Sequence, residues 1–189
     1  AWEISEYVRA QTVPVLLLLS GGSALSVVSQ LAVWDDMRGL TVVALDERFD
    51  PTNKESNVAR IAETAWFAGA VAHGASSIDT RTLPDDTPDA LAARFEQALV
   101  AWRTEYPTGI VAGLFGMGDD GHTAGIFPLP EDRETFAERF EGQHLVVAYR
   151  APDTAMNPLR VTVTLAYIRS FARGFAYICG DNKRGQLDR

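Results

Sequence analysis

The sequence predicts an α/β fold, a three-layer αβα sandwich around a mostly parallel, Rossmann-like sheet. Two observations support this prediction. Short apolar runs alternate with segments of helical periodicity along the chain, which is typical of strands that are connected by helices. Several runs are apolar at every position, as expected for strands that helices bury on both faces. The expected strands are 13–19, 40–45, 110–115, 145–149, 161–165 and 175–179.

Helices are expected between these runs. The clearest one follows Thr87, a suitable N-cap, and begins with Pro88 and Asp89, which favour a helix start. It extends to about Glu105, and its apolar stripe contains Leu91, Phe95, Leu99 and Trp102. Three further helices are expected at 3–10, after Gly22 and from Ser56, and the last two would bury Leu25, Val28, Leu31, Val58, Ile61, Ala65 and Trp66.

Composition and charge narrow the class of protein. The 189 residues are 47% hydrophobic and 22% charged, which is ordinary usage for a globular domain, so we expect one domain over residues 1–189. The net charge of −8 argues against a nucleic-acid partner. The apolar run 13–19 is too short to span a membrane, so no membrane partner is expected. The single Cys179 cannot form an internal disulfide and favours a cytoplasmic location.

Polar and glycine-rich segments follow four of the expected strands. In sheets of this kind ligands bind beyond the carboxyl ends of the strands, so these segments are the candidate site. They are Ser20-Gly21-Gly22-Ser23, Asp46-Glu47-Arg48, the loop 116–122 and Gly180-Asp181-Asn182-Lys183. The glycine turn and Lys183 favour a phosphate. A tight strand-to-helix turn and a solvated lysine without any ligand would give the same sequence pattern. Arg160 precedes its strand, so only the topology could bring it to this edge.

The loop 116–122 ends at His122, which can act as a base near neutral pH. Asp120 lies two residues earlier and could orient the imidazole ring, although a surface histidine beside acids is the plainer interpretation of the pair. The loop also contains the pattern G-x-G-x-x-G of dinucleotide-binding proteins. We reject that interpretation because Pro128 and Pro130 shorten the next segment, and because the next strand ends at 149–150 without an acidic residue.

Other catalytic patterns are absent from the sequence. There is no G-x-S-x-G motif for a nucleophilic serine. The three histidines, His73, His122 and His144, do not have the spacing of metal ligands. We therefore expect no metal site, and we expect a small anionic substrate held beside a general base.

Five segments together resemble the 6-phosphogluconolactonase branch of the glucosamine-6-phosphate isomerase/6-phosphogluconolactonase family. They are LLLLSGGS, ALDERFDPTNKESN, GLFGMGDDGHTAGIFP, LRVTVTL and ICGDNK. The resemblance implies hydrolysis of 6-phospho-D-glucono-1,5-lactone to 6-phospho-D-gluconate in the pentose phosphate pathway, without a cofactor. The partner would be this small phosphosugar lactone, and we expect a monomer or weak oligomer.

The resemblance also implies a role for each matching residue. His122 would be the base and Asp120 its partner. Arg48 and Asp46 would take part in catalysis. Phosphate would be bound by the turn of Ser20, Gly21, Gly22 and Ser23, by Arg160 and by Lys183.

The chain departs from the family pattern at a few places. Ala24 replaces a proline of the glycine turn, and Gly125 replaces a serine that often follows H-x-A. Relatives usually have a strand before the first helix, and a helix and strand after the lysine, so we expect terminal elements to be missing here.

Two rival functions fit the sequence less well. The isomerase branch is disfavoured because Phe127 stands where that branch has a glutamate, and Arg48 where it has a tyrosine. A non-catalytic sugar-phosphate sensor is disfavoured because no helix-turn-helix segment is visible and because Asp120 and His122 are retained.

Overall fold

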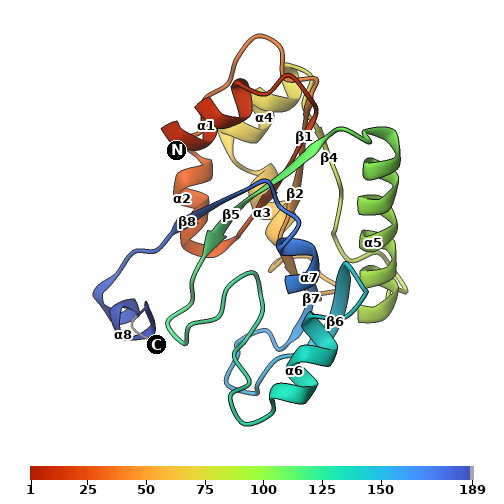
Figure 1. Ribbon diagram of the computed structural model, residues 1–189, viewed down its shortest axis with the longest axis vertical. Helices are drawn as coiled ribbons and strands as arrows, with labels where there is room; N and C mark the ends of the chain where they lie inside the picture. Colours follow the sequence, from red (N-terminus) through yellow and green to blue (C-terminus); the bar gives the residue numbers. More distant parts are fainter. Residues whose placement is uncertain (188–189) are drawn as a thin grey trace.

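The computed structural model describes residues 1–187 and contains a central sheet of five strands (Figure 1). All pairings in this sheet are parallel, and the strand order is β4-β2-β1-β5-β8. The strands are β1 (Val15–Leu19), β2 (Leu40–Ala44), β4 (Ser76–Ser77), β5 (Ile110–Gly116) and β8 (Arg173–Tyr177).

The central strand β1 explains why its run is apolar at every position. Val15, Leu17 and Leu19 belong to one hydrophobic core, and Leu16 and Leu18 belong to a second core. Figure 1 shows α5 on one side of the sheet and α1 and α2 on the other. The first core lies beneath α1 (Trp2–Arg9), α2 (Leu25–Val28), α3 (Asn57–Ala62) and α4 (Ala65–Ala72), and the second beneath α5 (Pro88–Glu105). The predicted three-layer α/β fold is confirmed.

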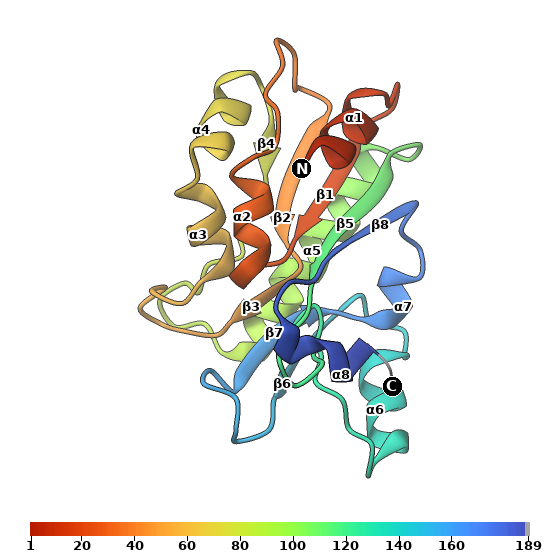
Figure 2. The same ribbon diagram turned by 90° about the vertical axis from the view of Figure 1, so that its left-hand side faces the viewer.

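Three strands form a separate antiparallel sheet that the sequence analysis did not distinguish from the central one. Its order is β3-β7-β6, and in Figure 2 it lies below the central sheet. The strands are β3 (Asp46–Arg48), β6 (Val146–Arg150) and β7 (Leu159–Val163). Only residues 151–158 connect β6 to β7, and so short a connection without a helix pairs neighbouring strands antiparallel. The inner face of this sheet packs against α5 through Val146, Val161 and Val163.

The predicted helix starts are confirmed, but the single helix expected from Ser56 is divided into two helices, α3 and α4. The Thr87 side chain accepts a hydrogen bond from the Ala90 N–H and caps α5 as expected. Ser56 caps α3 in the same way, but Thr64 adopts an extended backbone and begins α4 with a cap of its own. After Gly22 the chain forms a 3₁₀ turn, η1 (Gly22–Ala24), and then α2, which ends before Leu31.

Two short helices were not predicted: α6 (Arg133–Phe140) and α7 (Leu165–Ile168). The segment 180–183, whose sequence suggests the opening of a helix, forms the 3₁₀ turn η2 (Asp181–Lys183) and leads into α8 (Arg184–Leu187). Helix α6 contributes Phe140 to a third, small core with Ile126, Phe127, Tyr149 and Ala151, which anchors the segment after His122. No helix within residues 1–187 is both long enough and apolar enough to cross a membrane.

Candidate active site

The loops at the carboxyl ends of β1 and β5 meet with β3 and η2 around one cavity of about 250 Å³. Every site residue predicted from the sequence lines this cavity except Asp120. Asp120 is hydrogen-bonded to His122, which does line it. The lining includes Ser20, Gly21, Gly22, Ser23, Asp46, Arg48, Asn57, His122, Gly125, Arg160 and Lys183. The predicted residues therefore lie together, as expected for the carboxyl edge of a parallel sheet.

Strand β3 brings Arg160 into the site. The chain leaves the central sheet after β2 and pairs with β7, so that Arg48 lies directly opposite Arg160. Arg160 lies inside β7, so the prediction that it precedes its strand is wrong. Because β3 and β7 run in opposite directions, the start of one strand meets the end of the other. This pairing supplies the topology that the sequence alone left open.

The cavity gathers positive charge in a chain whose net charge is −8. Arg160 is 5% exposed, and its Nη1 lies 3.4 Å from Oδ2 of the buried Asp46. Arg48 donates from Nη1 to the Glu55 carbonyl oxygen at 3.3 Å. Lys183 is also buried and lines the same cavity. The Nε atoms of Arg48 and Arg160 are buried and have no hydrogen-bond partner within the described residues. The three cationic side chains that line the cavity suit an anionic ligand.

His122 and Asp120 form a close pair on the loop after β5. The Nδ1 atom of His122 lies 2.6 Å from Oδ1 of Asp120, which also accepts from the His122 backbone N–H at 3.2 Å. Gly118 makes room for this pair, since a Cβ there would lie 2.3 Å from the imidazole ring and 2.7 Å from Asp120 Oδ1. Gly118, the middle glycine of the G-x-G-x-x-G pattern, is therefore explained by the packing of His122 and Asp120.

The pair also fixes which imidazole nitrogen is free. Burial acts to raise the pKa of Asp120, but the hydrogen bonds from His122 outweigh burial and hold that pKa below its ordinary value. An ionised carboxylate only accepts hydrogen bonds, so Nδ1 of His122 carries the proton. The Nε2 atom then has the free lone pair and can accept a proton from a ligand or water.

Asn57 is a site residue that was not predicted, although it is the last residue of the segment ALDERFDPTNKESN. It is 1% exposed, and its Nδ2 donates to the Asp46 carbonyl oxygen at 2.8 Å. Its Oδ1 lies against Gly21, where a Cβ would come within 2.0 Å of it. Asn57 thereby connects the glycine turn after β1 to strand β3.

This contact leads to a prediction for Gly21→Ala. The new methyl group must displace the Asn57 side chain, which loosens its bond to Asp46 and shifts the glycine turn. We expect the KM for a phosphorylated substrate to rise by about tenfold, because small displacements in a site have large effects. Gly39→Ala is the matched control, since a Cβ there meets nothing within 4 Å. An unchanged KM for Gly21→Ala would show that the turn tolerates the shift.

Glu47 is a second residue whose importance appears only in the structure. Its side chain points away from the cavity and is 1% exposed. Its carboxylate accepts hydrogen bonds from the backbone N–H groups of Asn57 and Val58, both at 2.7 Å, and from Thr80 Oγ1 at 2.8 Å. Ser56 Oγ adds a longer bond of 3.3 Å. Glu47 therefore joins the back of β3 to the start of α3.

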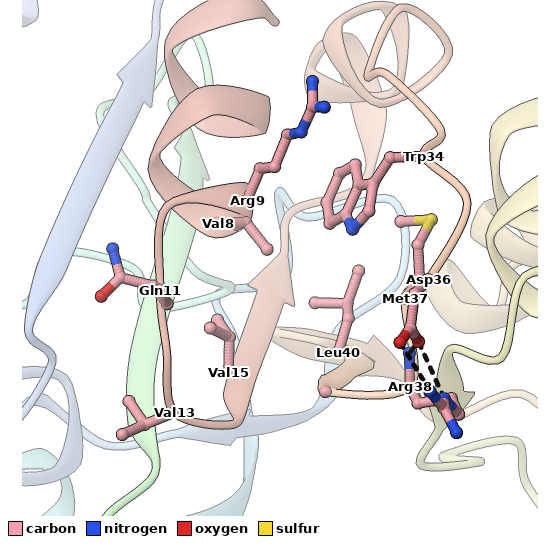
Figure 3. Close-up of a pocket in the computed structure, with 11 residues that line it drawn as sticks. Val8, Arg9, Gln11, Val13, Val15, Trp34, Asp36, Met37, Arg38 and Leu40 are labelled. Carbon is pink, nitrogen blue, oxygen red and sulfur yellow. Dashed lines mark hydrogen bonds and ion pairs between the residues drawn. The ribbon is translucent and has the colours of Figure 1, made fainter.

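A second depression, of about 440 Å³, lies at the opposite end of β1 and β2 (Figure 3). Two of its charged residues, Asp36 and Arg38, are exposed and pair with each other, with Arg38 Nη2 2.7 Å from Asp36 Oδ2. Arg9 and Trp34 also line this depression (Figure 3). The depression lacks the convergence of buried cations and a histidine that marks the carboxyl edge.

Comparisons with known proteins show the family of this chain. The family model for glucosamine-6-phosphate isomerases/6-phosphogluconolactonase matches residues 2–189. The chain belongs to this family. A 6-phosphogluconolactonase from Nostoc sp. is 31% identical over 180 residues, which cover 90% of this chain and 69% of that protein. One from Neisseria meningitidis serogroup A is 29% identical over 184 residues, which cover 92% of this chain and 72% of that protein.

The fold agrees with solved structures of the family. The crystal structure of a 6-phosphogluconolactonase from Shewanella baltica superposes with a TM-score of 0.75 at 23% identity. The superposition covers 100% of this chain and 76% of that one. At this identity the likeness supports the fold alone.

The structure explains why a glycine fits at position 125, where the family often has a serine. Gly125 has a φ of +67°, and a Cβ there would lie 2.7 Å from both Cβ and Oδ2 of Asp46. A serine would be strained in this backbone conformation and would press on Asp46. In this chain, therefore, the glycine allows the loop after His122 to pack directly on the Asp46 carboxylate.

Proposed function

We propose that this chain hydrolyses 6-phospho-D-glucono-1,5-lactone to 6-phospho-D-gluconate. The observation that carries the proposal is that one cavity contains both the histidine of the His122–Asp120 pair and three buried or partly buried cations. The first group suits removal of a proton from water, and the second suits an anionic phosphate. The activity named for the relatives in the same family supports the same reaction.

The substrate would bind through its phosphate. Arg48, Arg160 and Lys183 provide the positive charge, and the backbone of the glycine turn at 20–23 allows close approach. Binding energy from this remote group orients the lactone carbonyl toward His122.

The chemistry then needs one base and one site for developing negative charge. A water molecule between Nε2 of His122 and C1 of the lactone transfers a proton to Nε2 as its oxygen bonds to C1. The carbonyl oxygen becomes an oxyanion, stabilised by Arg48 or by backbone N–H groups. When the tetrahedral intermediate collapses, the bond from C1 to the ring oxygen breaks, and His122 returns the proton to that oxygen. Asp120 stabilises the imidazolium ion between these two transfers.

These steps are proton transfers and an addition to a carbonyl group, so the proposal requires neither a cofactor nor a covalent intermediate. Within residues 1–187 no group of three or more His, Cys, Asp or Glu side chains is placed to hold a metal ion. A place in the pentose phosphate pathway, a cytoplasmic location and a monomeric or weakly associated state remain predictions.

One assay separates this function from its rivals. The protein is offered fresh 6-phosphogluconolactone and, separately, glucosamine 6-phosphate, and acid release and ammonia release are followed. We expect acid release above the uncatalysed rate and no ammonia. Ammonia release would support the isomerase, which is disfavoured because the apolar Phe127 occupies the place of its glutamate. Tight sugar-phosphate binding without turnover of either compound would support the sensor.

A further inference from the structure

The imidazole ring of His122 has a second neighbour besides Asp120. The Phe127 ring stacks on it, with ring centroids 4.3 Å apart and planes inclined by 17°. Phe127 is 4% exposed and belongs to the small core that α6 completes with Phe140. The proposed base therefore lies between the carboxylate of Asp120 on the glycine-rich loop and a buried apolar cluster.

Phe127 is itself held firmly in place. Its backbone N–H donates to the Tyr149 hydroxyl oxygen at 3.2 Å, and the same hydroxyl donates to the Gly125 carbonyl oxygen. Tyr149 is 7% exposed and meets the Phe140 ring edge-on, with centroids 5.0 Å apart at 87°. These contacts leave the Phe127 ring little freedom to turn, because both its backbone and its packing partners are fixed.

The contacts of Asp120 and Phe127 restrict different motions of the imidazole. The hydrogen bond from Nδ1 to Asp120 restricts where Nδ1 lies but allows the ring to rotate about that bond. Asp120 is also half exposed, with 51% of its side chain accessible, and it lies on the glycine loop. Stacking on Phe127 restricts the plane of the ring, and the two contacts together determine the direction of Nε2.

We propose that Phe127 is a positioning residue that holds the His122 ring in the plane in which Nε2 meets the attacking water. The proposal rests on the hydrolytic function proposed above. The same Phe127 ring also contacts Arg160, whose Cζ lies 5.6 Å from the ring centroid. Arg160 is also held by Asp46, whose Oδ2 lies 3.4 Å from its Nη1, so its position does not depend on Phe127 alone.

The test compares Phe127→Leu, which keeps apolar volume but removes the stacked ring, with Phe127→Tyr, which keeps the ring. Phe136→Leu is the matched control, because Phe136 packs on Phe140 in the same small core, with centroids 5.0 Å apart. We expect Phe127→Leu to lower kcat by about tenfold with KM within about twofold, since orientation rather than binding is lost. Phe127→Tyr and Phe136→Leu should keep most of the wild-type kcat.

A nuclear magnetic resonance measurement tests the stacking without relying on activity. The chain has only 3 histidines, so their ring protons can be assigned by comparison with His122→Ala. In the folded wild type the ring current of Phe127 should move the His122 ring protons upfield of those of His73 and His144. In Phe127→Leu only the His122 signals should move back downfield.

The two readouts also separate the possible failures. A wild-type protein without lactone turnover overturns the proposed function, while its His122 shift still reports on the stacking. A wild-type His122 signal without an upfield shift overturns the positioning role, even if Phe127→Leu fails to fold. A folded Phe127→Leu with wild-type kcat also overturns it.

Discussion

Replacing His122 by alanine is expected to lower lactone turnover by about 10²–10⁴-fold, the range that a general base contributes. Binding of the product, 6-phosphogluconate, should stay within about twofold, because the phosphate contacts assigned to Arg48, Arg160 and Lys183 remain. Initial rates of acid release and calorimetric titration with the product measure the two quantities. The expected pattern is therefore a loss of kcat without a loss of affinity.

His144 provides the matched control for this experiment. Its Nδ1 lies 3.5 Å from Oε2 of Glu96, so it is also a histidine beside a carboxylate, but it is 77% exposed and lies outside the cavity. His144→Ala should keep wild-type turnover. If His122→Ala turned over the lactone as fast as His144→Ala, His122 would not be the base.

The second large effect is expected from Glu47, and it concerns stability. Glu47→Ala leaves the N–H groups of Asn57 and Val58 and the Thr80 hydroxyl buried without their acceptor. Unpaired buried donors cost about 1–3 kcal/mol each when they cannot reach water, and partial relaxation lowers the sum. We expect the free energy of unfolding to fall by about 3–5 kcal/mol, as measured by urea denaturation.

A surface carboxylate provides the comparison for Glu47. Glu141 pairs with Arg169 at 2.6 Å, and the side chains of this pair are 36% and 65% exposed, respectively. Glu141→Ala should change the free energy of unfolding by at most about 1 kcal/mol, as is usual for exposed ion pairs. Equal losses for the two variants would contradict the assignment of Glu47 as the anchor of β3.

Glu47 also predicts a pH dependence of stability. Burial raises the pKa of Glu47 from 4.5 to about 7, against the opposing effect of the hydrogen bonds it accepts. The folded state therefore binds the proton more tightly than the unfolded state does. The stability from this linkage is fully present below pH 4.5 and is lost as the pH rises through about 7. Glu47→Gln should lack this slope between the two values, and an unchanged slope would contradict it.

Much of the fold and of the site is readable from the sequence because the signals are local. Apolar runs such as 15–19 mark strands buried on both faces, and Thr87 marks a helix start through its own side chain. The loop that presents His122 is recognisable because glycines must stand where the histidine and aspartate pack. These features depend on neighbouring residues in the chain, so spacing reveals them.

The remaining features depend on contacts between distant segments. Arg160 reaches the site only because β7 pairs antiparallel with β3, which no local pattern encodes. Glu47 looks like a surface acid beside two charged neighbours, yet it is buried, and two distant segments, the start of α3 and Thr80, donate hydrogen bonds to it. Phe127 looks like an ordinary apolar residue, and its position against His122 follows from the packing around Tyr149.

The most direct test of the proposed function is the initial rate of acid release from fresh 6-phosphogluconolactone, measured with wild-type protein and with His122→Ala at equal concentration. The proposal predicts a wild-type rate well above uncatalysed hydrolysis and a His122→Ala rate that approaches it. A wild-type rate equal to the uncatalysed one would contradict the lactonase function. A fast rate in both proteins would contradict the assignment of His122 as the base.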